Sequence, residues 1–157
     1  MGKNNLRKEV ELLIAESFLK NFEINKFIDW SVRLLERGYN STNLLILAGL
    51  DNEDSIVIEK YFKLSCSDLR IDFEINKKIL MDKYLIYVVE GTIEKTFTIE
   101  QAANIFQKII EETSYKEYKY FDWIYLYDEL EDLTGIEAYK YVINKFKTFI
   151  NELENKQ

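Results

Sequence analysis

The chain of 157 residues contains no histidine, no proline, one cysteine and only five glycines. Without histidine it cannot form a Ser-His-Asp or Cys-His catalytic arrangement, a histidine-ligated metal site or a histidine proton relay. The phosphate-binding patterns GxxxxGK[ST] and GxGxxG are also missing from the sequence. These absences exclude many enzyme classes, and we predict a protein that is not an enzyme and binds no cofactor and no metal.

The single cysteine, Cys66, excludes an intramolecular disulfide and a cysteine-based zinc site. It lies between Ser65 and Ser67 without a basic neighbour to lower its pKa, which predicts an inert thiol that is buried or half-buried. The chain does not open on a signal-peptide pattern, and no apolar run approaches the roughly 18 residues that a membrane span needs. We therefore expect a cytoplasmic protein that does not enter the membrane.

The lack of proline and the scarcity of glycine favour a chain that is mostly helical, with short turns. Hydrophobic residues make up 47% and charged residues 31%, which are ordinary values for a globular protein. We predict one all-α domain over residues 1–157, with seven to eight helices. A compact bundle and a short helical-repeat array fit this pattern equally well.

Apolar residues repeat at helical spacing in eight segments. The expected helices cover 6–19, 24–38, 44–50, 55–70, 74–90, 98–110, 115–135 and 136–153. Ser41 is expected to cap the third helix, and Thr98 with Gln101 forms a capping-box pattern at the sixth. Gly38 and Gly91 are expected to end helices.

Three shorter patterns predict particular environments. The segment LLILAGL (44–50) is apolar on nearly all sides, so we expect it to be buried. Trp30 is expected at the edge of the core. The loop DNEDS (51–55) resembles a calcium loop, but Ile56 replaces the glycine at the sixth position and Phe62 replaces the bidentate glutamate, so helix capping is favoured.

The sequence shows one internal likeness and two likenesses to other proteins. Residues 15–39 and 90–115 both read as a helix end, a connector and an amphipathic helix, which would suit stacked helical hairpins. Residues 38–70, GYNSTNLLILAGLDNEDSIVIEKYFKLSCSDLR, resemble small bacterial helical proteins of uncharacterised function. This resemblance implies no activity. In general character the chain is also similar to bacterial toxin-immunity proteins, which are often small, acidic and cytoplasmic.

The stretch 115–135, YKEYKYFDWIYLYDELEDLTG, is unusually rich in aromatic and acidic residues. Read as a helix, it separates an apolar face containing Trp123 and Leu130 from a face that combines tyrosine with carboxylates. The expected partner-binding residues in this stretch are Tyr118, Asp122, Tyr125, Asp128, Glu129 and Asp132. Tyrosine supplies a large contact area at low entropic cost and is enriched at protein interfaces.

The net charge of −7 is concentrated in the same region. Between residues 111 and 137 there are nine acidic and two basic residues, a difference that equals the net charge of the whole chain. Such a region repels nucleic acid and attracts a basic protein. The same pattern would also arise from an ordinary amphipathic helix whose outer side is solvated, so both interpretations stay open.

We therefore predict a non-catalytic protein-binding module. Its most concrete form is an immunity or inhibitor protein that binds a basic partner. The alternative is a structural protein that forms a homodimer through residues 136–153 or the LAGL segment. A third hypothesis is an acid–base hydrolase that uses Asp122 with Glu129, or Asp128 with Asp132. Such an enzyme would need a cleft that raises the pKa of one carboxyl group.

Overall fold

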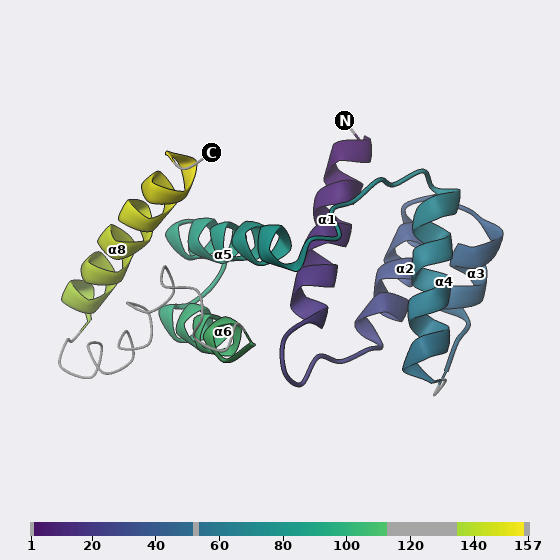
Figure 1. Ribbon diagram of the computed structural model, residues 1–157, viewed down its shortest axis with the longest axis horizontal. Helices are drawn as coiled ribbons and strands as arrows, with labels where there is room; N and C mark the ends of the chain where they lie inside the picture. Colours follow the sequence, from purple (N-terminus) through teal and green to yellow (C-terminus); the bar gives the residue numbers. More distant parts are fainter. Residues whose placement is uncertain (1, 52–53, 113–134, 156–157) are drawn as a thin grey trace. The chain divides into compact units, whose positions relative to one another are not determined.

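The computed structural model describes residues 2–51, 54–112 and 135–155, and in these ranges it contains seven α-helices and no strand. The all-α prediction is confirmed. The helices are α1 (Gly2–Ser17), α2 (Lys26–Glu36), α3 (Thr42–Ala48), α4 (Ser55–Asp68), α5 (Lys77–Ile93), α6 (Ile99–Glu112) and α8 (Ile136–Glu154) (Figure 1). The helix predicted over 115–135 lies outside the described residues.

The chain divides into two compact units, unit 1 (Met1–Leu80) and unit 2 (Met81–Gln157), and the boundary falls within α5. The prediction that residues 1–157 form a single domain stays a prediction.

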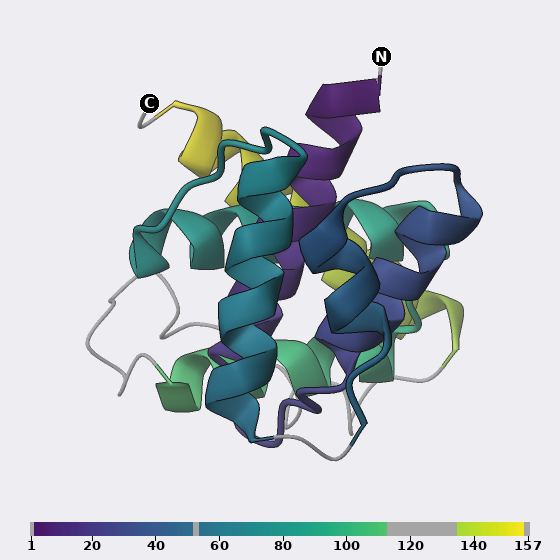
Figure 2. The same cartoon turned by 90° about the vertical axis from the view of Figure 1, so that its right-hand side faces the viewer.

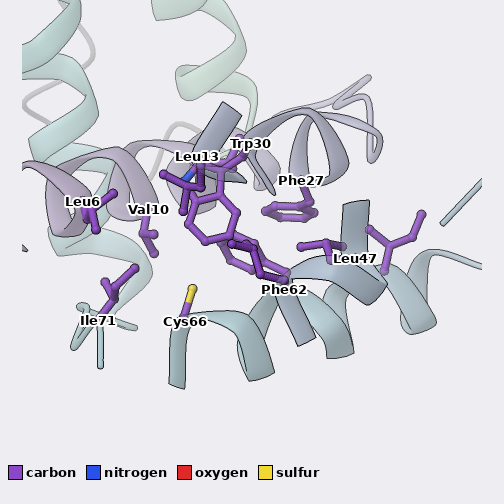
Figure 3. Close-up of a cluster of buried hydrophobic side chains, with 12 residues drawn as sticks. Leu6, Val10, Leu13, Phe27, Trp30, Leu47, Phe62, Cys66 and Ile71 are labelled. Carbon is purple, nitrogen blue, oxygen red and sulfur yellow. The ribbon is translucent and has the colours of Figure 1, made fainter. Parts of the chain in front are cut away.

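Unit 1 is built on α2, α3 and α4, which pack against one another (Figure 2). Apolar residues of α1 join their core, and the chain after α4 completes it with Ile71 (Figure 3). The buried cluster consists of Leu6, Val10, Leu13, Phe27, Trp30, Leu34, Leu44, Leu47, Ile58, Phe62, Cys66 and Ile71. Removing this apolar surface from water is the main stabilising contribution to the unit.

Trp30 lies at the centre of this core and not at its edge, because only 1% of it is exposed. Its ring meets Phe62 edge to face with 5.0 Å between centroids, and Phe62 lies 4.2 Å from Phe27. The expectation of an edge position was wrong, because α2 packs against both α3 and α4 and Trp30 belongs to the buried cluster that these helices share.

The predicted caps of three helices are confirmed in atomic detail. Ser41 Oγ accepts a hydrogen bond from the backbone N–H of Leu44, and Asp54 caps α4 by accepting from the N–H of Ile56. Asp54 therefore acts as a helix cap, as the sequence favoured. The capping box of α6 is also present: Gln101 donates its N–H to Thr98 Oγ1, and its side-chain oxygen accepts from the N–H of Thr98.

Three helices end in the same hydrogen-bonded turn, in which two N–H groups beyond the helix donate back to carbonyls of its last turn. The residue in the left-handed conformation is Gly38 after α2, Arg70 after α4 and Lys95 after α5. At α4, for example, Ile71 donates to the carbonyl of Cys66, and Arg70 donates to that of Ser67. Only the first of these ends uses glycine, the residue that suffers no steric penalty there.

Unit 2 contains α6 and α8, whose apolar stripes are buried. Phe106 of α6 meets Phe146 of α8 edge to face, with 5.1 Å between ring centroids. The buried residues of these two helices are Ala102, Ala103, Phe106, Ile109, Ile110, Val142, Ile143, Phe146 and Phe149. The buried stripe of α8 begins after its first turn, in which Ile136 is 73% exposed.

Gly91 does not end a helix as expected, because α5 continues to Ile93 and turns at Lys95. Its role is a close approach between backbone and side chain: a Cβ atom at Gly91 would lie 2.5 Å from Cδ2 of Phe97. The carbonyl of Gly91 accepts hydrogen bonds from the N–H groups of Thr96 and Phe97, which holds the turn against the helix.

The LAGL segment is only half buried. Leu44 and Leu47 are fully enclosed, whereas Leu45 is 54% and Ile46 38% exposed. The seven-residue helix α3 packs one of its faces against α2 and α4, so its other face is exposed to solvent. The two echoing segments, 15–39 and 90–115, do each contain a helix end and a turn, followed by α2 and α6 respectively.

Candidate functional site

The residues predicted to bind a partner, Tyr118, Asp122, Tyr125, Asp128, Glu129 and Asp132, lie outside the described residues. Their assignment stays a prediction. The two carboxylate pairs considered for hydrolysis lie in the same segment. A further candidate site lies among the described residues of unit 1.

Unit 1 contains a pocket of about 300 Å³ with mainly apolar walls. Its apolar lining residues come from α1, α2, α4 and two connecting segments: Ile14, Phe18, Phe27, Phe62, Phe73 and Ile75. Four of these six are phenylalanines, so the walls are largely aromatic. Phe27 and Phe62 also belong to the buried core, which gives that wall a fixed position (Figure 3).

The polar lining residues are Ser17, Glu59 and Lys63. The hydroxyl of Ser17 donates a hydrogen bond to the carbonyl of Ile14 at 2.6 Å, which leaves its oxygen as an acceptor. Glu59 and Lys63 are exposed and stand one turn apart on α4. The structure therefore places one negative and one positive group beside the same apolar pocket.

One wall of the pocket is the non-helical segment 71–76, which carries Phe73 and Ile75. Buried Glu11 of α1 holds this segment: its Oε1 atom accepts from the N–H of Glu74 at 3.0 Å and from Arg7 Nε at 2.9 Å. The carboxylate raises the pKa of Arg7 by hydrogen bonding and by charge. The same carboxylate oxygen of Glu11 therefore binds both Arg7 and the backbone of the segment that forms this wall.

A second set of hydrogen bonds fixes the end of this wall. The Glu74 side chain accepts from the N–H groups of Ile75 and Asn76, at 2.9 and 2.8 Å. Asn76 Oδ1 then accepts from the N–H groups of Lys78 and Ile79, which caps the start of α5. Ile75 is held at the mouth of the pocket, where 79% of it is exposed.

No pattern in the sequence predicted this pocket. Ile75 was expected to pack within a helix over 74–90, but that helix begins at Lys77. The spacing of Glu59 and Lys63 is common on solvated helices, and it indicates a site only when the apolar walls beside it are known.

Cys66 is buried against the core, as predicted, and burial raises the pKa of its thiol to about 12. A thiol in this state is not a nucleophile near neutral pH. Among residues 2–51, 54–112 and 135–155, no group of three or more Cys, Asp or Glu side chains is arranged to hold a metal ion. Within the same ranges, no helix has the length and apolar character of a membrane span.

Comparison with known proteins gave no relative from which a function can be transferred. No protein family, no curated protein and no solved structure was found to match the chain. The function must therefore be argued from the residues of this chain alone.

Proposed function

We propose that this chain is a non-catalytic protein-binding module that binds a basic partner through the acidic, tyrosine-rich residues of segment 115–135. The observation that carries the proposal is the charge distribution, because residues 111–137 account for the whole net charge of −7. In this proposal Tyr118 and Tyr125 anchor the partner, and the carboxylates of the segment pair with its lysines and arginines.

Several acidic residues of unit 1 differ from those of segment 111–137 in that they do not add to the net charge of the chain. In unit 1, three acidic side chains are already paired with basic ones: Glu9 with Arg37, Glu11 with Arg7 and Glu16 with Lys26. The Glu9 pair bridges α1 and the end of α2, with both carboxylate oxygens 2.9 Å from one guanidinium nitrogen. These three carboxylates pair within the fold of unit 1, whereas the net charge of the chain comes from residues 111–137, where we propose that it attracts the partner.

The partner's class follows from the charge. An inhibitor or immunity protein that acts on a basic target in the cytoplasm is the most concrete form of the proposal. Opposite charge would accelerate encounter more than it tightens the final complex, so the association should weaken as salt is added.

The experiment is a pull-down from a lysate of the source organism with three baits. The first is the wild type, and the second carries Asp122→Lys, Glu129→Lys and Asp132→Lys. The third carries the same change of charge at exposed glutamates elsewhere, Glu23→Lys, Glu36→Lys and Glu152→Lys. All three should have matching melting temperatures.

A basic protein retained by the wild type and the third bait, and lost by the second, would support the proposal. Equal loss in both charge variants would reduce the effect to net charge and overturn the assignment of the segment. Capture by all three baits, or binding that does not respond to salt, would contradict it as well.

A second candidate function, self-association, is favoured by the exposed face of α3. Leu45 and Ile46 stand side by side in the sequence, and both are exposed. Light scattering over a range of concentrations tests this candidate against a Leu45→Asn, Ile46→Asn variant. A dimer that becomes a monomer in the variant would support it, and a wild type that is monomeric throughout would remove it.

A further inference from the structure

The pocket of unit 1 combines three properties that point to one class of ligand. Its volume of about 300 Å³ is at the lower end of the range for small-molecule sites. Four phenylalanines and two isoleucines line it, so its interior suits a flat apolar group. The apolar walls alone would accept any apolar group of that size. The charged side chains beside the pocket restrict the class of ligand further.

Glu59 and Lys63 bring opposite charges to the same pocket. They are four residues apart, with the glutamate first, which is the arrangement that favours an ion pair on a helix. Among the described residues, however, neither side chain has an ion-pair partner within 4.0 Å. Both charges are thus accessible to a ligand that carries the complementary pair.

We propose that this pocket binds a small zwitterion with a large apolar side chain, of which the free aromatic amino acids are the simplest members. The side chain would occupy the space between Phe27, Phe62 and Phe73. The ammonium group would pair with Glu59 and the carboxylate with Lys63. Both groups sit on a single carbon of the ligand, and both pairing residues sit on one turn of α4.

The walls are suited to hold such a ligand without large rearrangement. Phe62 is fixed by its contacts with Phe27 and Trp30. Phe73 lies in the segment that Glu11 ties to α1. A site whose walls are held in place loses little conformational entropy on binding, which favours affinity for a small ligand.

The first experiment is isothermal titration calorimetry of the full chain with L-phenylalanine and four analogues. The analogue 3-phenylpropionate lacks the ammonium group, and 2-phenylethylamine lacks the carboxylate. N-acetyl-L-phenylalaninamide carries neither charge, and glycine lacks the apolar side chain. L-phenylalanine should bind, and each analogue should bind at least about tenfold more weakly, because each loses a charged pair or the apolar contact.

Two variants assign the charges to their partners. Glu59→Gln should weaken L-phenylalanine and 2-phenylethylamine and leave 3-phenylpropionate unchanged. Lys63→Gln should weaken L-phenylalanine and 3-phenylpropionate and leave 2-phenylethylamine unchanged. Glu36→Gln, at an exposed position of α2, is the matched control and should change none of them. Both pocket positions are exposed, so the fold should persist, which the melting temperature verifies.

Three results would overturn the proposal. One is the absence of heat with every ligand up to about 10 mM, a concentration that would reveal even millimolar affinity. Another is equal binding of N-acetyl-L-phenylalaninamide and L-phenylalanine, which would describe a site for an uncharged side chain such as one presented by a protein. The last is an equal loss of all ligands in both charge variants. None of these results bears on the segment 115–135, so the two proposals fail independently.

Discussion

Unit 1 and unit 2 bury their apolar residues in different ways. Unit 1 combines two longer helices, α1 with 16 residues and α4 with 14, with the shorter α2 and α3, of 11 and 7 residues, and with the non-helical segment 71–76. In unit 2, α6 and α8 are 14 and 19 residues long and carry regular apolar stripes. A long stripe can cover a facing helix continuously, whereas short helices and an extended segment leave space between their ends. The pocket of unit 1 lies where the chain leaves helical geometry.

The largest expected effect comes from matched core truncations, Phe62→Ala in unit 1 and Phe106→Ala in unit 2. Both rings are almost fully buried and touch other aromatic rings. Each variant should lose about 3–5 kcal/mol of unfolding free energy, since a cavity replaces the ring. Urea denaturation followed by circular dichroism measures the loss.

The same two variants test whether the units form one domain. If residues 1–157 unfold together, both substitutions should lower the midpoint of a single transition. Two transitions, each shifted by only one of the variants, would contradict the single-domain prediction. The conservative pair Phe62→Leu and Phe106→Leu keeps the test interpretable if either alanine variant does not fold.

Glycine substitutions give the next largest effect, in opposite environments. Gly91→Ala should cost about 1–3 kcal/mol, because the added methyl group collides with the ring of Phe97 in a packed turn. At Gly49 an added methyl group meets only ordinary contacts of 3.5 and 3.6 Å, so Gly49→Ala should be neutral or slightly stabilising. Thermal melts of both variants provide the comparison, and equal losses would refute the close approach at Gly91.

Cys66 makes the stability of unit 1 sensitive to alkaline pH. The unfolded thiol releases its proton near its ordinary pKa of 9.0, whereas burial keeps the folded thiol protonated up to a pKa of about 12. The unfolded state therefore binds fewer protons between these values, and stability falls as the pH rises. From pH 8 to pH 10 the loss due to this group should be about 1.4 kcal/mol.

The Cys66→Ala variant isolates this contribution. It retains the tyrosine and lysine titrations of the wild type but lacks the thiol, so it should lose less stability over the same interval. Urea denaturation at the two pH values gives the difference. Identical pH dependence in both proteins would show that the thiol is accessible to water.

The smallest expected effects come from the three equivalent helix ends. Arg70→Gly and Lys95→Gly should each stabilise the protein by about 0.5–1 kcal/mol, since glycine adopts the left-handed conformation without a steric penalty. Gly38→Ala should destabilise it by a similar amount. The melting temperature should therefore rise when glycine is introduced and fall when glycine is replaced, whichever unit carries the helix end. A stabilising Gly38→Ala would contradict this account.

Local features of the fold were predictable because they depend on neighbours in the chain. Ser41, Asp54 and the pair Thr98–Gln101 cap helices as expected, since capping depends on residues within one turn. The position of Trp30 and the exposure of Leu45 depend on which helices pack together, and periodicity does not encode that. At Gly91, the expected helix end was displaced by a contact with the ring of Phe97.

The two candidate sites also differ in whether the sequence alone could predict them. The acidic segment was recognised from composition and charge, which a sequence states directly. The pocket was not, because its lining residues come from α1, α2, α4 and the segment 71–76, and only the fold brings them together. Glu59 and Lys63 indicate a site only together with the phenylalanines beside them, and three of those, Phe18, Phe27 and Phe73, come from other segments of the chain.

The hydrogen bond between Glu11 and the N–H of Glu74 also has a consequence for the order of folding. It joins residues 63 positions apart, whereas α2, α3 and α4 are neighbours in the chain and pack with short connections. Closing a long loop costs more chain entropy than closing a short one, so the helices should assemble first and the Glu11 bond should form late. An interaction made after the transition state retards unfolding without accelerating folding. Removal of the Glu11 side chain should then increase the rate at which the wall of the pocket unfolds and change the rate of folding little.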